Sequence, residues 1–435
     1  MGNVEAEQKS SRHDRIAELR KAVFGAAIGN MIEWFDYASY GYLATIIAAV
    51  FFAPGDQTAA LLGAFAVFAV SFIVRPIGGI FWGHYGDKLG RRRTLIFTIT
   101  IMSVATFTIG LLPGYARVGV MAPILLLLIR MVQGFAASGE YAGSASFIAE
   151  YAPKEKRGLL VSMVPASTAA GLLFAALITS VLDYYLSPGA LHSWGWRIPF
   201  LLALPLGIVG LIIRLRLEDT PVFQEMEEGS HADEERGLKA LKPYWKKIII
   251  AFGIVLLNAV GFYTILSYMP TYLMEEINFS RLHGTLITLV TLFAYVLMLP
   301  LIGTLADHVG RKKVLMTTCI VFIVATYPIF LLLSLGGIWS VLALFLLGAC
   351  LAGNDGVLAT FLTEMFPTSI RFTSFGLTFN TGNAIFGGTA PFVATFLIAS
   401  TGNKFAPAFY LMLAAAICLI ALLKTTETAN KELNN

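Results

Sequence analysis

The chain has 435 residues, of which 57% are hydrophobic and only 13% are charged. Soluble domains carry about 25% charged residues, so this composition indicates a protein embedded in a lipid bilayer and argues against a soluble enzyme. The net charge of +4 is too small to indicate nucleic acid as a partner. Cys319, Cys350 and Cys418 lie in apolar runs without metal-ligand or redox spacing, so we expect buried free thiols.

Apolar runs long enough to cross a bilayer follow one another along the chain. A spanning helix needs about 20 mostly apolar residues, and the sequence predicts twelve: 22–50, 58–83, 94–112, 120–149, 160–183, 197–216, 246–272, 284–304, 314–335, 338–363, 372–400 and 406–424. The polar stretch 217–245 divides them six and six. We therefore expect a tail (1–21), a six-helix bundle (22–216), a solvated linker with or without a short amphipathic helix (217–245), a second bundle (246–424) and a tail (425–435).

Basic residues are distributed unevenly between the two sides of these spans. Of the 31 Lys and Arg residues, Arg117, Arg197, Arg281 and Lys404 fall on one side, Arg75 and Arg130 fall within spans, and the rest flank the other side. Because Lys and Arg collect in cytoplasmic loops, this asymmetry predicts that both termini are cytoplasmic. We expect no cleavable signal peptide ahead of the first span.

Two motifs occur once in each half of the chain. GHYGDKLGRRR at 83–93 returns as GTLADHVGRKK at 303–313, and EYAPKEKR at 150–157 returns as EMFPTSIR at 364–371. The first pair follows the second and eighth spans, and the second pair follows the fourth and tenth. These matching positions predict two half-bundles with a shared plan, as a duplicated transporter would have.

These motifs resemble those of the major facilitator superfamily. Its loop signature, Gly-x-x-x-Asp-Arg/Lys-x-Gly-Arg/Lys-Arg/Lys, is matched at 83–92, and its Arg-x-x-Gln-Gly signature at 130–134. GNMIEWFDY, RMVQGFAASGEYAG, GWRIPF, LEDTPVF and SYMPTYL are similar to strings of the metabolite:proton symporter family. The resemblance covers about residues 20 to 424. It implies an all-α membrane protein with twelve transmembrane helices in two pseudo-symmetric bundles, working as a proton-coupled transporter.

The loop signatures and their acidic neighbours are predicted to serve structure and switching at the membrane surface, where arginines can pair with acids such as Glu150. Contacts made in one state and broken in another would bias the access equilibrium. The predicted gating residues are Arg75, Gly83, Asp87, Gly90, Arg91, Arg92, Glu150, Arg157, Gly303, Asp307, Gly310, Arg311, Asp355, Glu364 and Arg371. For Arg75 two interpretations stay open: the floor of a cavity, or a side chain that reaches the membrane surface.

The first span carries two acids, Glu33 and Asp36, near its middle. A carboxylate at the bilayer centre costs about 2.5–3.5 kcal/mol on insertion scales, so each acid needs a partner, water or a proton. Their spacing places both on one helix face, which must be turned away from lipid. At about 1.5 Å per residue, Asp36 lies at the depth of Arg130 in the fourth span, and we expect these two to pair.

A carboxyl group beside a guanidinium releases its proton. A carboxylate that loses this contact in an apolar site binds a proton. An acid whose distance to Arg130 changes between conformations is therefore a proton carrier, and we favour Asp36 over Glu33; a static ion pair is the alternative. Glu140 and Asp355 occupy near-equivalent positions in the two halves. Each is interpreted as a gate that pairs across the halves or as a brace for the following loop, and a proton relay stays open for Glu140.

Aromatic and amide side chains supply the predicted substrate site. Faces of Trp and Tyr bind quaternary ammonium groups with about 0.5–2 kcal/mol each, although such rings also serve as packing or as an interfacial belt. Asn and Gln would add neutral hydrogen bonds. The predicted substrate-binding residues are Trp34, Tyr37, Tyr40, Gln133, Asn258, Tyr263, Tyr268, Asn380 and Asn383.

The predicted substrate is a zwitterion such as proline, glycine betaine or a related osmolyte. Only Arg75 and Arg130 fall within spans, and Arg130 is assigned to the helix acids, whereas a di- or tricarboxylate would need two or more free cations. GEYAG, LEDTPVF and SYMPTYL look closest to proline/betaine carriers, and NAIFGGTAP is also similar to organic-acid carriers. Symport of citrate, 2-oxoglutarate or shikimate is therefore the alternative, followed by metabolite or drug exchange. About eleven residues follow the last span without heptads, so osmotic sensing through a coiled-coil tail is not expected.

No histidine cluster, nucleotide-binding loop or nucleophile arrangement is present in the sequence. We therefore expect no enzymatic activity, no metal and no cofactor, with the proton as the coupling ion. The expected partners are a small-molecule substrate, protons and the lipid bilayer, and we expect a functional monomer that does not bind nucleic acid. The family likeness implies a multi-pass protein of a bacterial cytoplasmic (inner) membrane.

Overall fold

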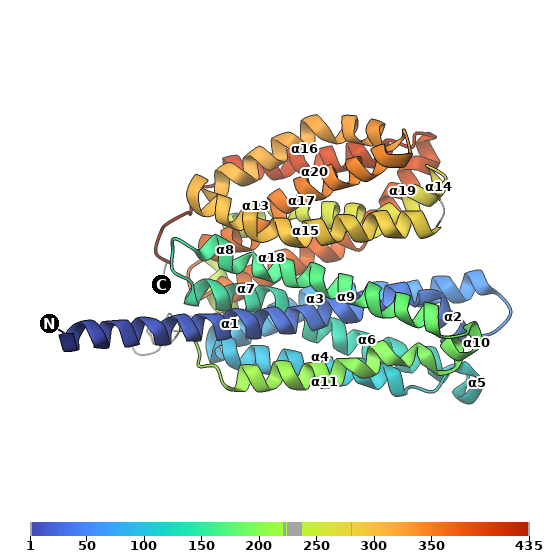
Figure 1. The fold of residues 1–435 in the computed structure, drawn as a ribbon, viewed down its shortest axis with the longest axis horizontal. Coiled ribbons are helices and arrows are strands. Elements are labelled where there is room, and N and C mark those ends of the chain that lie inside the picture. Colours follow the sequence, from blue (N-terminus) through green and yellow to red (C-terminus); the bar gives the residue numbers. More distant parts are fainter. Residues whose placement is uncertain (1, 221–222, 224–236, 280, 434–435) are drawn as a thin grey trace.

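The computed structural model describes residues 2–220, 223, 237–279 and 281–433. It is built from helices stacked as two halves, the first drawn in blue to green and the second in yellow to red (Figure 1). Both chain ends lie at the same end of the long axis. We call this end the termini end and the other the opposite end.

The first half contains one long helix for each predicted span, together with short connecting helices: α1 (Gly2–Tyr42), α2 (Ala44–Phe51), α3 (Gln57–Leu89), α4 (Arg91–Leu111), α5 (Tyr115–Val118), α6 (Met121–Ala137), α7 (Glu140–Tyr151), α8 (Arg157–Val161), α9 (Met163–Tyr185), α10 (Pro188–Ala190), η1 (Leu191–Gly195) and α11 (Arg197–Leu215). The second half repeats the plan: η2 (Gly237–Tyr244), α13 (Trp245–Phe262), η3 (Tyr263–Tyr268), α14 (Met269–Glu275), α15 (Arg281–Val309), α16 (Arg311–Leu333), α17 (Gly337–Met365), α18 (Arg371–Gly382), η4 (Asn383–Gly387), α19 (Ala390–Thr401) and α20 (Ala406–Leu423).

Eleven helical spans within the described residues are long and apolar enough to cross a membrane. The remaining predicted span is the inner part of α1, whose apolar character is lowered by the buried side chains of Asn30, Glu33 and Asp36. This part of α1 packs along α9, α11 and α7 and completes the first bundle. The predicted fold class, twelve helices in two similar bundles, is confirmed.

Several spans that the sequence predicted as single helices are interrupted. The first divides at Leu43, the fourth at Ser138 and Gly139, and the fifth at Ser162. The seventh and eleventh contain the π-helical segments η3 and η4. A π-helical turn adds one residue without changing composition, so hydropathy does not reveal it, and such turns are frequent at functional sites.

The predicted tail and linker also differ from expectation. Residues expected as a polar tail ahead of the first span form the start of α1. In the linker, the structure describes 217–220, Phe223 and the 3₁₀ helix η2. The rest of the predicted linker, including most of any amphipathic helix there, lies outside the described residues.

Charged side chains lie inside this molecule and apolar side chains lie on its surface. The guanidinium groups of six arginines are fully buried: Arg75, Arg91, Arg130, Arg214, Arg311 and Arg371. Leu62, Ile73, Leu301 and Val324 are each more than 60% exposed. A surface of this kind is stable against lipid and not against water, so the fold is that of a multi-pass membrane protein.

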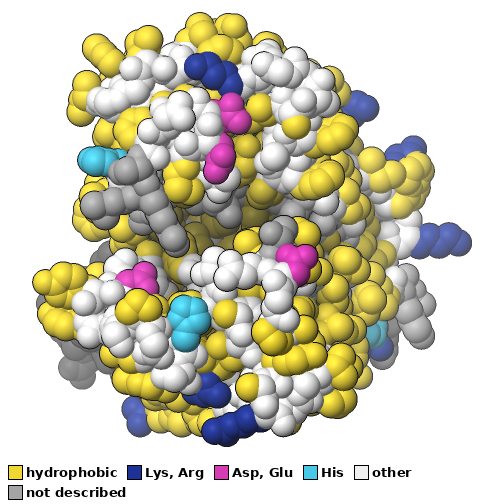
Figure 2. Space-filling view, turned by 90° about the vertical axis from the view of Figure 1, so that its right-hand side faces the viewer, with side chains coloured by type: hydrophobic (Ala, Val, Ile, Leu, Met, Phe, Trp, Pro, Cys, Tyr) yellow, Lys and Arg dark blue, Asp and Glu magenta, His cyan; other side chains and the backbone are white. Residues whose placement is uncertain are grey.

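The two halves meet at the termini end, where α3 packs against α18, and α15 packs against α8 and α9. Glycines permit the close approach. A Cβ on Gly83 would lie 2.5 Å from the Cα of Thr373, and a Cβ on Gly303 would lie 2.5 Å from the carbonyl oxygen of Gly158. The face at the opposite end is hollowed between the halves (Figure 2). The structure is therefore closed at the termini end and open at the opposite end.

Replacing Gly303 by Ala should disfavour this conformation, because the added methyl group overlaps the carbonyl oxygen of Gly158. This oxygen belongs to the backbone, so it cannot move aside as the end of a flexible side chain can. Spin labels at the exposed positions Glu155 and His308, one on each half at the termini end, should show a larger population of long distances in Gly303→Ala. Gly41→Ala is the matched control, since a Cβ there meets no atom within 4 Å. An unchanged distance distribution in Gly303→Ala would contradict this account of the closed end.

Candidate functional site

Each of the two acids in α1 pairs with its own arginine. Arg130 Nη1 donates to Asp36 Oδ2 at 2.9 Å, as the depth comparison predicted. Arg75 Nη2 donates to Glu33 Oε1 at 2.8 Å. Since Arg75 is fully buried, the interpretation that it reaches the membrane surface is wrong. Both arginines that the sequence placed within spans are therefore bonded to acids of the same helix.

The Asp36–Arg130 pair is held by a small network within the first half. Gln133 Nε2 donates to the same Asp36 oxygen at 3.0 Å and to Thr106 at 2.7 Å. The guanidinium of Arg130 lies 3.9 Å above the ring of Tyr40. Asp36 Oδ1 and two nitrogens of Arg130 are buried without a hydrogen-bond partner among the described residues. A buried pair that leaves such atoms unsatisfied is only weakly favourable, so a change of protonation or geometry can open it.

Aromatic rings enclose the second pair. The guanidinium of Arg75 lies 4.4 Å from the ring centre of Tyr37 and 4.8 Å from that of Phe72. Its Nε donates to the Tyr37 hydroxyl at 3.3 Å. Tyr37, predicted to bind substrate, instead stabilises the Arg75 side chain in this conformation.

Glu140 does not pair across the halves, although the termini end is closed. Both of its carboxylate oxygens accept from Arg214 of α11, and Thr98 donates to Glu140 Oε2 at 2.9 Å. Arg214 also donates to the carbonyl oxygens of Gly25 and Leu95. The predicted gate pairing of Glu140 is therefore wrong for this conformation. Sequence reasoning missed Arg214 because it counted this residue among the basic residues that flank the sixth span.

Asp355 likewise bonds within its own half. Asn258 donates to its Oδ1 at 2.5 Å, and the hydroxyl of Tyr295 donates to its Oδ2. The predicted pairing of Asp355 across the halves is therefore also wrong for this conformation.

A small cavity lies between the halves. The first half contributes Trp34, Tyr141, Pro165 and Thr168, and the second contributes Asn258, Phe262, Asp355, Phe379 and Asn383.

Three of the predicted substrate-binding residues line this cavity: Trp34, Asn258 and Asn383. The other predicted residues do not line it: Tyr37, Tyr40, Gln133, Tyr263, Tyr268 and Asn380. Asn380 instead donates across the halves to the Ser138 carbonyl oxygen at 2.8 Å. Phe262, the last residue of α13, lines the cavity, whereas its neighbour Tyr263, which the sequence predicted, does not.

At the termini end, the repeated motifs form two matching networks. In the first, Glu150 pairs with Arg91 of its own half at 3.1 Å and with Arg371 of the other half at 2.6 Å. Asp87 pairs with Arg91 and accepts from the backbone N–H groups of residues 372 and 373. The predicted pairing of the loop arginines with Glu150 is confirmed.

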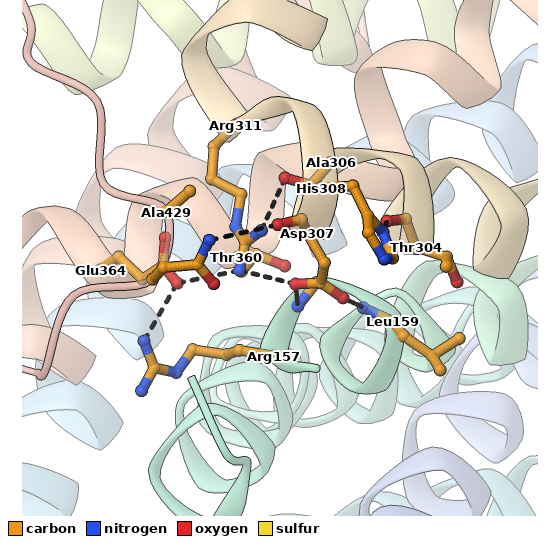
Figure 3. A network of polar contacts seen from close by, with 12 residues as sticks. Arg157, Leu159, Thr304, Ala306, Asp307, His308, Arg311, Thr360, Glu364 and Ala429 are labelled. Atoms are coloured by element: carbon orange, nitrogen blue, oxygen red, sulfur yellow. Dashed lines mark hydrogen bonds and ion pairs between the residues drawn. The ribbon is translucent and has the colours of Figure 1, made fainter. Parts of the chain in front are cut away.

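The second network is equivalent to the first, with the roles of the two halves exchanged (Figure 3). Glu364 pairs with Arg311 of its own half and with Arg157 of the first half. Asp307 accepts from the N–H groups of Gly158 and Leu159. Each half thus contributes a carboxylate that holds an arginine of the other half, which closes the molecule at this end.

Other signature residues shape the loops themselves. Gly90 and Gly310 have φ values of +101° and +112°, in the left-handed region that only glycine adopts readily. Arg92 donates to the carbonyl oxygens of Arg214 and Leu215, so in this conformation it satisfies the end of α11 rather than bridging the halves.

Two acidic residues that sequence reasoning did not select complete these networks. Asp219, after α11, accepts from the backbone N–H of Arg91 at the start of α4. Glu427, after α20, accepts from the backbone N–H of Arg311 at the start of α16. The following threonines donate to the network acids, Thr220 to Glu150 and Thr428 to Glu364. The shared Asp/Glu-Thr pair after the sixth and last spans was the sequence signal that could have revealed them.

A cavity between two similar six-helix halves, closed at one end by reciprocal ion pairs and open at the other, defines a transporter that works by alternating access. The family model described as sugar (and other) transporter matches residues 22–246, and the model described as major facilitator superfamily matches residues 251–435. The chain belongs to the major facilitator superfamily.

Alignments with named relatives cover nearly the whole chain. It is 40% identical over 425 residues to the glycine betaine/proline/ectoine/pipecolic acid transporter OusA of Dickeya dadantii, with 95% of this chain and 85% of that protein covered. It is 38% identical over 426 residues to the proline/betaine transporter of Escherichia coli strain K12, with 96% and 85% covered.

Among solved structures, the chain is similar in fold to the proton:xylose symporter XylE bound to 6-bromo-6-deoxy-D-glucose. The TM-score is 0.82 at 17% identity, covering 96% of this chain and 98% of that one. The inward open conformation of XylE from E. coli matches with a TM-score of 0.66 at 18% identity, covering 95% and 98%.

Breaking the Glu140–Arg214 pair should destabilise the first half. Glu140→Gln leaves a buried guanidinium without its counter-charge, which costs about 3–5 kcal/mol, so the thermal unfolding midpoint in detergent should fall clearly. The double variant Glu140→Gln/Arg214→Met removes both charges and should recover much of the loss. Lys154→Ala breaks the exposed Lys154–Glu432 pair and should leave the midpoint unchanged. A single variant as stable as the wild type would refute this role.

Glu427 should stabilise the termini end in a pH-dependent way. Burial acts to raise its pKa, but the backbone N–H groups of residues 311, 312, 428 and 429 outweigh burial and hold the pKa below its ordinary value. A carboxyl group with a lowered pKa stabilises the folded state above its unfolded pKa, and this contribution is lost as pH falls through the folded pKa.

Glu427→Gln should therefore lower the unfolding midpoint at pH 7, and the difference from the wild type should shrink below about pH 4.5, the ordinary glutamate pKa. Unfolding curves of both proteins between pH 3.5 and pH 7.5, on the order of six steps, measure this difference. A difference that grows on acidification would contradict the sign of the effect.

Proposed function

We propose that the chain imports a small zwitterionic osmolyte or amino acid of the proline and glycine betaine type together with protons. The chemistry of the central cavity carries this proposal. Its lining includes one carboxylate and four aromatic rings, and no Lys, Arg or His among the described residues. A di- or tricarboxylate would need buried counter-charges there, which disfavours the organic-acid alternative. The relatives named for glycine betaine, proline and ectoine support the same class.

In this proposal the termini end faces the cytoplasm, because the loops there carry most of the basic residues. The cavity then opens outward in the present conformation, ready to receive substrate from outside. The chain acts as a monomeric transporter in a bacterial cytoplasmic membrane, with the proton as its coupling ion and without enzymatic activity or a cofactor.

Asp36 is the proton carrier. Protonation cancels the charge that Asp36 offers to Arg130 and weakens the contact between α1 and α6. Helix α1 also carries Trp34 at the cavity, so loosening this contact allows the helix to close over a bound substrate. When the termini end opens, renewed contact with Arg130 expels the proton into the cytoplasm.

The membrane potential makes this cycle accumulate substrate. One charge that moves inward gains about 2.3 kcal/mol per 100 mV, which corresponds to an accumulation of about fifty-fold when one proton accompanies one zwitterion.

Asp36→Asn should uncouple transport in proteoliposomes. With an imposed pH gradient and potential, labelled glycine betaine or proline should accumulate many-fold with the wild type and only to equilibrium with Asp36→Asn, because Asn carries no proton. Counterflow of preloaded substrate should persist in the variant, since exchange needs no net proton movement. Accumulation that survives in Asp36→Asn would refute the assignment.

Glu33→Gln is the matched control, since it changes the neighbouring acid of the same helix. If Glu33→Gln and not Asp36→Asn loses accumulation and keeps counterflow, the proton carrier is Glu33. Labelled citrate and 2-oxoglutarate test the substrate class in the same vesicles: uptake of these and not of the zwitterions would contradict the proposed function.

A further inference from the structure

Asp355 differs from the other buried acids in the described part of the chain. Each of the others has an arginine within ion-pair distance: Glu33, Asp36, Asp87, Glu140, Glu150, Asp307 and Glu364. Asp355 is only 2% exposed and bonds to the amide of Asn258 and the hydroxyl of Tyr295. Both are neutral donors. The two hydrogen bonds orient the carboxylate but do not balance its charge.

A buried carboxylate without a counter-charge is costly, so it must be protonated or meet a cation. Asp355 lines the cavity between the halves, where an incoming molecule can supply that cation. The cavity walls suit a cation that carries alkyl groups. Trp34, Tyr141, Phe262 and Phe379 present aromatic rings there, and ring faces attract ammonium groups by about 0.5–2 kcal/mol each.

The same cavity offers a donor for the other end of such a molecule. Trp34 Nε1 is buried and has no hydrogen-bond partner among the described residues, although a buried indole N–H normally finds one. Trp34 and Thr168 belong to the first half, and Asp355 belongs to the second. A bound zwitterion can therefore direct its nitrogen to Asp355 and its carboxylate to the Trp34 N–H.

We infer that Asp355 is the counter-ion for the cationic nitrogen of the transported substrate, and that it selects zwitterions over anions of the same shape. This inference rests on the proposed transport function and makes Asp355 a specificity-determining residue rather than a gate. Because the substrate then bridges a carboxylate of one half and an indole of the other, its binding draws the two halves together around the cavity.

The test compares glycine betaine with 3,3-dimethylbutanoate, its carbon isostere, which has the same shape and carboxylate but no positive charge. Equilibrium binding of both probes is measured on the purified full chain in nanodiscs. The wild type should bind glycine betaine about 100-fold more tightly or better, the range expected for a desolvated charge pair. Asp355→Asn should lose most of this preference, through weaker binding of glycine betaine. Asp355→Glu should retain it in part.

Asp183→Asn, which removes an exposed carboxylate at the opposite end of α9, is the matched control and should bind both probes as the wild type does. Equal affinity of the wild type for the two probes overturns the inference without any variant, so it stays testable if Asp355→Asn does not fold. Undiminished betaine preference in a folded Asp355→Asn also overturns it. So does a variant that binds normally but loses proton-driven accumulation, since Asp355 would then be a proton carrier.

If the wild type binds glycine betaine, proline and ectoine no more tightly than an unrelated sugar, the proposed function itself fails. That outcome is distinct from failure of the inference about Asp355, because each result that overturns the inference is obtained with a wild type that does bind zwitterions more tightly than the sugar.

Discussion

The neutralisation of charge inside an apolar bundle is the constraint on which this structure depends. Glu33–Arg75 ties α1 to α3, Asp36–Arg130 ties α1 to α6, and Glu140–Arg214 ties α7 to α11. Helices in lipid have little hydrophobic reason to associate, whereas an unpaired buried charge is strongly unfavourable. The ion pairs therefore join helices that otherwise pack mainly on other partners, since α1 lies chiefly along α9, α11 and α7. They also make those contacts sensitive to a single proton.

The termini end uses the same chemistry for closure. Glu150 and Glu364 each hold one arginine from either half, and Asp87 and Asp307 each accept from backbone N–H groups of the other half. Asp219 and Glu427 accept hydrogen bonds from the first backbone N–H groups of α4 and α16, respectively. All these contacts are local and polar, so opening this end exchanges them for water without disturbing the packing within each half. Such a joint favours two discrete arrangements over a continuous deformation.

Much of this could be predicted from the sequence because lipid imposes long apolar runs and because duplication repeats its motifs. The spans, the two halves and the Asp36–Arg130 pair follow from length, depth and charge. The Glu140–Arg214 pair did not follow, because Arg214 was counted among the basic residues that flank the sixth span, and only the packing of the helices places it beside Glu140. Phe262 was missed because only Trp and Tyr were considered as substrate-binding rings, and Phe262 is the aromatic residue of α13 that lines the cavity. Asp355 was selected, but its partners in the described structure, Asn258 and Tyr295, could not be predicted because they depend on how the helices of the second half pack.

The two carboxylates proposed to bind the proton and the solute lie on separate halves of the molecule. In the described structure Asp36 bonds to side chains of the first half, and Asp355 bonds to side chains of the second. A carrier that used one acid for both ligands would couple them by competition, with each ligand displacing the other. In the proposed mechanism, proton and solute occupy different sites, so thermodynamic linkage between them must pass through a rearrangement that both favour. A proton or a solute molecule alone would then cross the membrane only when the rearrangement takes place with one of the two sites empty. The rarity of that event limits leakage.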